Sequence, residues 1–290
     1  MQRYSLCFLV ALSVVLFSVV YWDLEEVLPK PITANTLLEI CGKDRGDRRL
    51  APFSLAPLNL SCNCGNANYV FITMSAAENF EKRSAVRQTY GSRMQQRNNS
   101  YCAYFLVALP NQDFIQEKLE AESRTHKDII QSEFVENYKN LTIKTLAMLR
   151  FARDHCPTTR AVFKIDDDML LLPKKMFKED NFAKVAMYGL AAIKDPVNRE
   201  EQHKWYMSNV SYTNDTYPTF LRGGLYMVNT AAVGRLVEAA ESFCEYTYLE
   251  DVFITGIVAT KTGVPVEDRS LTSTTPTRWD VERSSLYGHR

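Results

Sequence analysis

The chain has 290 residues, which allows one large domain or two small ones with a substantial core. Its 34 Lys and Arg residues balance 34 Asp and Glu residues, so the composition provides neither a basic field for nucleic acid nor an acidic tail. Function must therefore be inferred from local motifs.

The first such motif is an uncharged apolar stretch from Tyr4 to Trp22. As a helix it would extend roughly 28 Å, close to the thickness of a bilayer core. Arg3 precedes it and Asp23 follows it, which predicts a cytoplasmic tail (1–3), a transmembrane signal anchor (4–22) and a luminal remainder. The alternative is a cleaved signal peptide, although the run is long for one and has no clear Ala-x-Ala-like exit.

Residues 23–67 combine several prolines with a run of mixed charge at 43–49. Such composition disfavours a packed core and predicts a luminal stem in front of a luminal domain at 68–290. Of the seven cysteines, six lie outside the apolar stretch; six allow fifteen pairings, so connectivity is open. Secretory passage is also indicated by glycosylation sequons at Asn59, Asn98, Asn140, Asn209 and Asn214.

Strands and helices then alternate along the chain, which predicts an α/β fold around a largely parallel sheet. The expected strands are 69–74, 104–108, 128–131 and a run beginning at 161, and the expected helices are 80–97, 112–126 and 141–155. No Gly-x-Gly-x-x-Gly follows the first strand, and no P-loop is present anywhere. A metal ion is therefore the natural partner for any substrate phosphate.

The strand that begins at Ala161 ends in three consecutive acids, Asp166, Asp167 and Asp168. Open α/β sheets bind ligands at the carboxyl ends of their strands, and residues two apart on a strand face the same side. Magnesium-like ions take one or two carboxylates plus substrate phosphates. The acids thus favour a metal-bridged diphosphate site, with an acidic surface turn as the alternative.

Beyond Leu172 the chain is expected to be rich in loops and aromatic residues, including Trp205 and Tyr217. Aromatic rings on loops suit sugar binding, although they could equally cover a core. The pair Gly223-Gly224 permits positive φ or close backbone approach to a ligand, and is also compatible with a simple turn.

A second acidic pair, Glu250 and Asp251, directly precedes an apolar run and is predicted to open a helix. Either acid could simply cap the helix or serve as a general base at a pocket rim. Arg83 and Arg87 share one face of the first predicted helix. They could pair with diphosphate oxygens or form a solvated stripe.

Several blocks, in this order, resemble the β1,3-galactosyltransferase family of Golgi enzymes, which includes β1,3-N-acetylglucosaminyltransferases. The resemblance covers roughly residues 69–266. The blocks are Arg83 to Tyr90, Glu136 to Thr145, Phe163 to Asp168, Lys204 to Ser208, Tyr217-Pro218 with Gly223 to Tyr226, and Glu250 to Val252.

The resemblance implies a single GT-A-like catalytic domain, type II Golgi membrane topology, a UDP-sugar donor, Mn²⁺ or another divalent cation, and inversion at the anomeric carbon. Galactose or an N-acetylhexosamine would pass to a hydroxyl of a glycan acceptor on protein or lipid, giving a β1,3 linkage. The roles it implies are base for Asp251, with Glu250 as the fallback; metal ligand for Asp168 and Asp166; nucleotide-sugar contacts for Asp166, Asp167, Arg83 and Arg87; and sugar-site walls for Trp205, Tyr217, Gly223 and Gly224.

Three positions depart from the family pattern. Tyr90 stands where tryptophan is usual, and Val258 lies near a cysteine position, which leaves the partner of Cys244 open. Family members commonly have a late histidine at the metal; His289 is the only histidine after Glu250, and it could equally be a frayed terminal residue.

Two other functions are compatible with these motifs: a noncatalytic luminal sugar-binding module whose acids hold calcium, and an inactive transferase homologue. Against the first, residues 166–172 lack the calcium-loop pattern. The sequence does not select among galactose, N-acetylglucosamine and N-acetylgalactosamine as donor, because that choice depends on contacts to one substituent. All versions of the transferase hypothesis require Asp166 to Asp168 and Glu250-Asp251 to meet at one cleft.

Overall fold

The computed structural model describes residues 67–91, 101–171, 187–242, 247–269 and 271. The predicted membrane anchor, nearly all of the stem, two sequons (Asn59 and Asn98) and His289 lie outside these ranges, and so do all cysteines except Cys102 and Cys156. Within these ranges, no helix has the length and apolar character needed to cross a bilayer.

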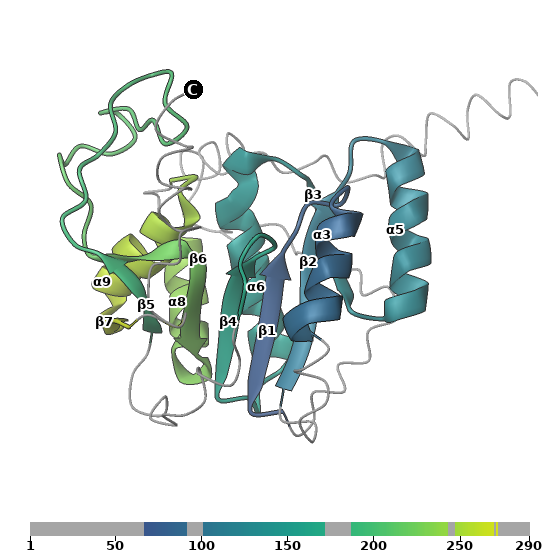
Figure 1. The fold of residues 1–290 in the computed structure, drawn as a ribbon. Helices are drawn as coiled ribbons and strands as arrows, with labels where there is room; N and C mark the ends of the chain where they lie inside the picture. Colours follow the sequence, from purple (N-terminus) through teal and green to yellow (C-terminus); the bar gives the residue numbers. More distant parts are fainter. Residues whose placement is uncertain (1–66, 92–100, 172–186, 243–246, 270, 272–290) are drawn as a thin grey trace, which may run out of the picture. The chain divides into compact units, whose positions relative to one another are not determined.

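In the described part of the chain, seven strands form one sheet in the order β3-β2-β1-β4-β6-β5-β7 (Figure 1). The first half is parallel and consists of β1 (Tyr69–Met74), β2 (Tyr101–Leu109), β3 (Ile129–Val135) and β4 (Ala161–Asp166). Strands buried on both faces read as continuous apolar runs, which is why these four were visible in the sequence. The bounds of β1 and the start of β4 are as predicted, whereas β2 and β3 are longer than expected.

The second half of the sheet shows that the region predicted to be rich in loops also contains strands, although residues 193–219 form neither helix nor strand apart from one isolated bridge. The strands there are β5 (Met187–Ala192), β6 (Phe220–Asn229) and β7 (Val266–Asp268). β6 runs antiparallel to both β4 and β5, with Leu225 opposite Ile165. β6 was not predicted from the sequence because a glycine pair lies in its middle. Glycine weakens the side-chain pattern by which a strand is recognised.

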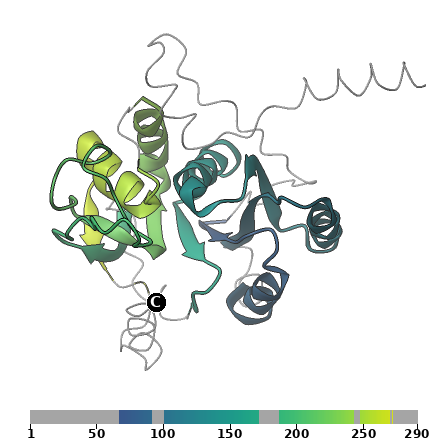
Figure 2. The same ribbon diagram turned by 90° about the horizontal axis from the view of Figure 1, so that it is seen from above.

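Helices cover both faces of the sheet (Figure 2). One face, with Phe71 and Phe163, packs against α3 (Phe80–Val86), its wider continuation η1 (Arg87–Gly91) and α5 (Asp113–His126). The other, with Val70 and Val162, packs against α6 (Leu141–His155), α8 (Thr230–Ser242), η3 (Val252–Val258) and α9 (Ala259–Thr262). The short turn η2 (Tyr138–Asn140) leads into α6. The expected mixed and largely parallel sheet between helices is confirmed.

Between β5 and β6 lies a long segment, residues 193–219, which we call the β5–β6 segment. It is closed at its base by a bridge between Pro196 and Thr216 and by backbone hydrogen bonds, from Val197 N to Asp215 O at 2.8 Å and from Tyr217 N to Asp195 O at 2.9 Å. These contacts fix both ends of the segment beside the strands that it joins.

Candidate active site

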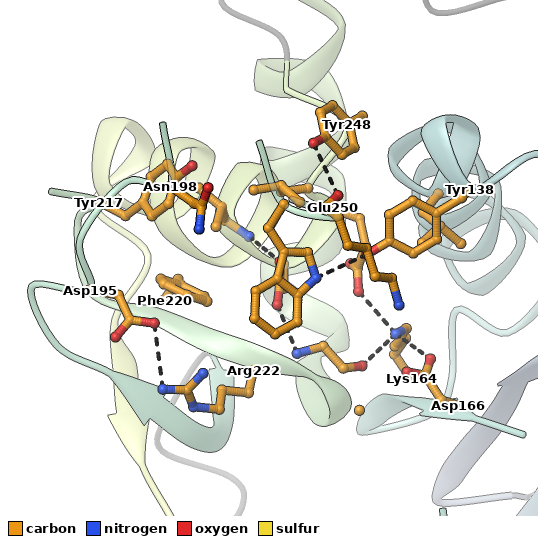
Figure 3. A pocket seen from close by; sticks show the side chains of 18 of the residues that line it. Tyr138, Lys164, Asp166, Asp195, Asn198, Tyr217, Phe220, Arg222, Tyr248 and Glu250 are labelled. Atoms are coloured by element: carbon orange, nitrogen blue, oxygen red, sulfur yellow. Dashed lines mark hydrogen bonds and ion pairs between the residues drawn. The ribbon is translucent and has the colours of Figure 1, made fainter. Parts of the chain in front are cut away.

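A cavity of about 300 Å³ opens at the carboxyl end of β4 (Figure 3). Asp166 lines it from β4, and Glu250 and Asp251 line it from the start of the helix that continues as η3. The two acidic motifs, separated by some eighty positions in the sequence, therefore share one pocket. Trp205, Tyr217 and the Gly223-Gly224 pair, which the resemblance also assigned to the site, line the same pocket.

Lys164 connects the two acidic motifs. Its Nζ donates to Asp166 Oδ1 at 2.6 Å and to the Gly223 carbonyl, and it forms an ion pair with Glu250 Oε1 at 2.9 Å. Burial lowers the pKa of Lys164, but the carboxylates of Asp166 and Glu250 outweigh burial, and the net pKa lies above its usual value. Lys164 is therefore a permanent cation that holds the motifs together. Sequence reasoning missed it, although a lysine inside an apolar strand was a signal for a buried ion pair.

Glu250 is buried and fully engaged. Besides Lys164, its carboxylate accepts hydrogen bonds from the Tyr226 hydroxyl at 2.9 Å and from the Thr145 hydroxyl at 3.1 Å. Burial raises the pKa of Glu250, while Lys164 lowers it. A carboxylate with three donors around it is suited to fixing the geometry of the site rather than to taking up a proton from a ligand.

Asp251 has a different environment from its neighbour. Its Oδ1 accepts from Val252 N at 2.8 Å, and its Oδ2 accepts from Gly223 N at 3.0 Å. Burial raises the pKa of Asp251, and the two backbone amides and Lys164 oppose that rise. Asp251 thus caps the helix and also lines the pocket, so the capping and base interpretations are compatible.

Gly223 and Gly224 are not a turn, which corrects one of the sequence readings. Both lie within β6, and neither has positive φ. A Cβ on Gly223 would lie 2.9 Å from Glu250 Oε1 and 3.2 Å from Asp251 Oδ2. The groups that approach the Gly223 backbone closely are the two acids, and its predicted close approach to a ligand stays a prediction.

Substituting Gly223 with Ala is therefore expected to displace the acids and lower activity by about 10²-fold, because a shift of about 1 Å in an active site has that scale of effect. Gly234 is a matched control, since a Cβ there meets no atom within 4 Å. Gly234→Ala lies within α8 and should stabilise the protein by up to ~1 kcal/mol with unchanged turnover. Thermal unfolding and turnover of both variants test this; equal activity in Gly223→Ala would contradict it.

The three consecutive acids have three different environments. Asp166 lines the pocket, whereas Asp167 accepts from Ser75 Oγ at 2.9 Å and Asn79 Nδ2 at 2.8 Å and pairs with Lys82. Asp168 is exposed. Where the structure describes the chain, no group of three or more His, Cys, Asp or Glu residues could hold a metal ion. One or two carboxylates are enough for a metal that also binds substrate phosphates. Of the three acids, Asp166 alone lines the pocket, and a role for Asp168 at the metal stays a prediction.

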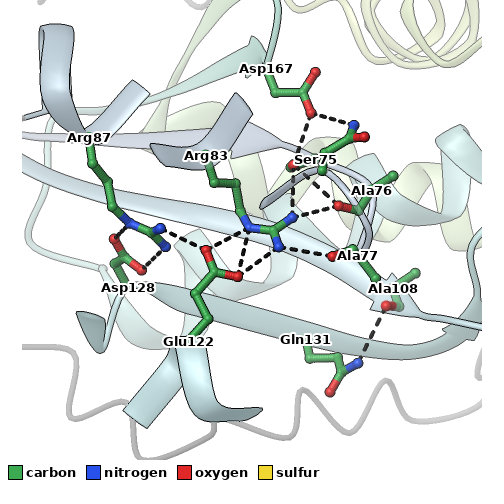
Figure 4. Close-up of polar contacts among 11 residues, drawn as sticks. Ser75, Ala76, Ala77, Arg83, Arg87, Ala108, Glu122, Asp128, Gln131 and Asp167 are labelled. Atoms are coloured by element: carbon green, nitrogen blue, oxygen red, sulfur yellow. Dashed lines mark hydrogen bonds and ion pairs between the residues drawn. The ribbon is translucent and has the colours of Figure 1, made fainter. Parts of the chain in front are cut away.

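Arg83 and Arg87 are not brought into the pocket, which corrects the prediction that they contact the nucleotide-sugar. Arg83 is fully buried and donates to Glu122, to Ser75 Oγ and to the carbonyls of Ala76 and Ala77 (Figure 4). Arg87 pairs with Glu122 at 2.6 Å and with Asp128 at 2.7 Å. Arg83 nevertheless shares a partner with the acidic motif, because Ser75 Oγ also donates to Asp167.

Aromatic side chains also line the pocket. Trp205 is half exposed, and its Nε1 donates to the Tyr138 hydroxyl at 3.2 Å. Tyr138 packs edge-on against Tyr248, and both line the pocket. Neither tyrosine was singled out from the sequence, because their proximity to Trp205 depends on the tertiary fold. Tyr217 is buried, with its ring against Tyr212 and Phe220.

The sequons in the described part of the chain differ in accessibility. Asn209 and Asn214 are exposed. Asn140 is buried, and its Nδ2 donates to Val135 O at 3.0 Å. That nitrogen has no room for a glycan in the folded chain, so the prediction of glycosylation at Asn140 is wrong for this conformation.

Comparison with known proteins shows which family the chain resembles. A family model described as Galactosyltransferase matches residues 81–270. Human lactosylceramide 1,3-N-acetyl-beta-D-glucosaminyltransferase is 27% identical over 218 residues, which cover 71% of this chain and 57% of that protein. Beta-1,3-galactosyltransferase 5 of Gorilla gorilla gorilla is 28% identical over 203 residues, covering 69% of this chain and 67% of that protein. The match therefore spans little more than half of the first relative.

A solved mannosyltransferase, PcManGT from Pyrobaculum calidifontis in complex with GDP-Man and Mn2+, aligns at 14% identity over 85% of this chain and 66% of that chain. Its TM-score is 0.41, too low to support an argument about this protein. The family model, in contrast, covers more than half of the chain and includes both acidic motifs. The predicted family resemblance is confirmed, and the chain belongs to the galactosyltransferase family.

Proposed function

We propose that the protein is an inverting hexosyltransferase that moves galactose or an N-acetylhexosamine from a UDP-sugar to an acceptor glycan hydroxyl, forming a β1,3 linkage. The observation that carries the proposal is the shared pocket of Asp166 and Asp251, with Lys164 between their motifs. A cation site and a base facing one cavity are the two components that such a transfer requires.

In this mechanism Asp251 accepts the proton of the attacking acceptor hydroxyl. The hydroxyl oxygen then displaces the diphosphate in line, which converts an α-linked donor into a β-linked product. Lys164 and Glu250 hold the other acids in position. Asp166 and Asp168 are the residues that would hold a divalent cation. When bound, such a cation neutralises the negative charge that develops on the leaving diphosphate. No covalent nucleophile is needed.

Cellular placement is part of the proposal. The uncharged stretch at 4–22 would anchor the protein in the Golgi membrane as a single-pass type II protein, with the acidic pocket in the lumen. The exposed sequons at Asn209 and Asn214 and the six cysteines outside that stretch suit a secretory compartment.

Purified full-length protein in detergent should be assayed with UDP-galactose, UDP-N-acetylglucosamine and UDP-N-acetylgalactosamine, each with and without Mn²⁺, on glycolipid, O-glycan and N-glycan acceptors. Transfer of one sugar, lost with a chelator and restored by Mn²⁺, is the expected result. If the protein binds sugar but neither transfers it nor hydrolyses the donor, the result would instead indicate the noncatalytic module or the inactive homologue.

Asp168→Asn is expected to weaken Mn²⁺-dependent binding of the UDP-sugar by about tenfold or more, because it removes one carboxylate from a site with few. Calorimetric titration of the donor at several Mn²⁺ concentrations measures this. Asp154→Asn is the control, since Asp154 is an exposed acid on α6 whose ion pair with Arg153 lies on the surface. Equal donor affinity for the two variants would remove Asp168 from the metal site.

A further inference from the structure

An ion pair in the lining of the pocket leaves both of its partners open to a ligand. Arg222, on β6, has its Nη2 3.4 Å from Asp195 Oδ2, and the two side chains are 52% and 36% exposed. Both residues line the cavity. Among the described residues, no group hydrogen-bonds the Arg222 guanidinium or the Asp195 carboxylate. Their donors and acceptors are therefore available to a molecule in the pocket.

The pair is loose for an arginine and a carboxylate. Arg87 and Asp128, for comparison, are 2.7 Å apart and hydrogen-bonded. Hydrogen bonds between a guanidinium and a carboxylate have N···O distances of about 2.7–2.9 Å, shorter than the distance between Arg222 and Asp195. A ligand hydroxyl can therefore accept from the guanidinium and donate to the carboxylate without breaking a hydrogen bond of the described chain.

Both charged groups extend from anchored backbone close to the reacting acids. Arg222 directly precedes Gly223, whose N donates to Asp251 Oδ2 at 3.0 Å. The carbonyl of Asp195 accepts from Tyr217 N at 2.9 Å, at the closed base of the β5–β6 segment. Groups held in place in this way bind a ligand at a small cost in ordering. A molecule bound by the pair also lies beside the proposed base.

The direction of the Arg222 side chain indicates which substrate it meets. In Figure 3 its guanidinium is directed toward Asp195 and away from Asp166. The diphosphate of the donor would lie at Asp166 with the cation. The pair therefore faces the molecule that brings the attacking hydroxyl.

The charges of the pocket indicate the chemical class of that molecule. Arg222 and Asp195 cancel each other, and the described residues that line the cavity include four acids and three bases. An anionic acceptor would bring its charge close to the Asp195 carboxylate, and like charges at close range disfavour binding. A neutral sugar matches the pair, because each of its hydroxyls both donates and accepts.

We infer that Arg222 and Asp195 form an acceptor subsite that binds neighbouring hydroxyls of a neutral sugar and excludes acceptors with an anionic group there. This inference rests on the proposed function. It is narrower than that function, because it concerns the acceptor alone and names the class of acceptor.

Arg222→Met tests the first half of the inference in the full-length protein in detergent. The p-nitrophenyl β-glycosides of galactose, N-acetylglucosamine and N-acetylgalactosamine serve as acceptors, each with a set of analogues that lack one hydroxyl. The acceptor KM should rise by about tenfold, because a hydrogen bond to a charged group is lost, while the KM for the UDP-sugar stays at the wild-type value. A deoxy analogue that is poor for the wild type should lose its penalty in this variant.

Asp195→Asn tests the second half. The probe is the glycoside with a sulfate ester at the hydroxyl whose removal harms the wild type. This ester should be a poor acceptor for the wild type, and its penalty relative to the neutral glycoside should shrink by about tenfold in Asp195→Asn, because the repelling carboxylate is gone. Comparing the two proteins with one ester removes the effect of its size.

Arg153→Met is the matched control. Arg153 pairs with Asp154 at 2.7 Å, and these side chains are 39% and 49% exposed, but neither residue lines the pocket. Its acceptor KM should not change. The melting temperatures of all three variants should remain close to that of the wild type, because half-exposed ion pairs contribute little to folding.

The outcomes separate the inference from the proposed function. If the wild type transfers no sugar from any donor to any acceptor, the proposed function fails. If the wild type transfers sugar but Arg222→Met keeps the wild-type acceptor KM, or changes the KM of the UDP-sugar instead, only the inference fails. It fails as well if the wild type prefers the sulfate ester to the neutral glycoside. Should Arg222→Met or Asp195→Asn not fold, the pair is structural and the inference is wrong.

Discussion

Asp251→Asn is expected to reduce sugar transfer by about 10³-fold while UDP-sugar and Mn²⁺ binding remain at wild-type values, the typical result of removing a general base. Asp251 lies in the pocket, and its two oxygens accept from the backbone amides of Val252 and Gly223. Asparagine keeps one acceptor oxygen, so the helix start loses one hydrogen bond at a cost of about 1 kcal/mol and the fold survives.

Single-turnover transfer and equilibrium donor binding, measured on the same samples, separate chemistry from binding in this variant. Asp268→Asn is the control, because Asp268 also accepts from a backbone amide, Ala191 N at 2.9 Å, yet lies outside the pocket. Equal transfer rates in Asp251→Asn and the wild type would exclude Asp251 as the base.

The acid side of the pH profile is part of the same expectation. Burial raises the pKa of Asp251, and a base acts only when it is deprotonated. Transfer by the wild type should therefore be complete above that raised pKa and be lost as the pH falls through it. The residual activity of Asp251→Asn should not show this loss at low pH.

Lys164→Met is expected to have the second large effect, a loss of roughly 3–5 kcal/mol of folding stability together with loss of transfer. The side chain of Lys164 is 5% exposed and so is that of Glu250. Removing the cation leaves the carboxylates of Glu250 and Asp166 close together without a counter-charge, and such a buried charge is costly.

Lys82→Met is the matched control. The Lys82–Asp167 pair has the same N···O distance, 2.9 Å, but the Lys82 side chain is 48% exposed. Surface pairs contribute about 0–1 kcal/mol, so this variant should unfold almost like the wild type. The double variant Lys164→Met with Glu250→Gln should recover part of the lost stability, because it neutralises one stranded charge. Urea unfolding measures all four proteins; no recovery would show that Lys164 acts through packing alone.

Those parts of the fold that local pattern determines were predictable from sequence. β1, the start of β4 and α6 have the predicted bounds, since their apolar runs and helical spacing are unambiguous. The family resemblance also predicted correctly that Asp166 and Asp251 lie at one pocket. β5 and β6 were missed because their pairing is antiparallel and distant in sequence, and because Gly223 and Gly224 interrupt the pattern of β6.

Partners far along the chain account for the other errors. Arg83 and Arg87 do share a helix face, but the acids that pair with them, Glu122 and Asp128, lie on later segments. Nothing in the local pattern distinguishes a buried ion pair from a ligand contact. The role of Lys164 likewise depends on β6, which places Gly223 beside it, and on the helix that places Glu250 there.

The closed base of the β5–β6 segment has a consequence for how the protein can change. Both ends of residues 193–219 are tied to each other, and three of the residues that tie them, Asp195, Pro196 and Tyr217, also line the pocket. Insertions or replacements in such a tethered excursion cost little closure entropy and do not move the framework. The segment that carries Trp205 and Tyr217 can therefore be replaced as a unit. Ligand recognition can then diversify while the contacts around Lys164 are kept.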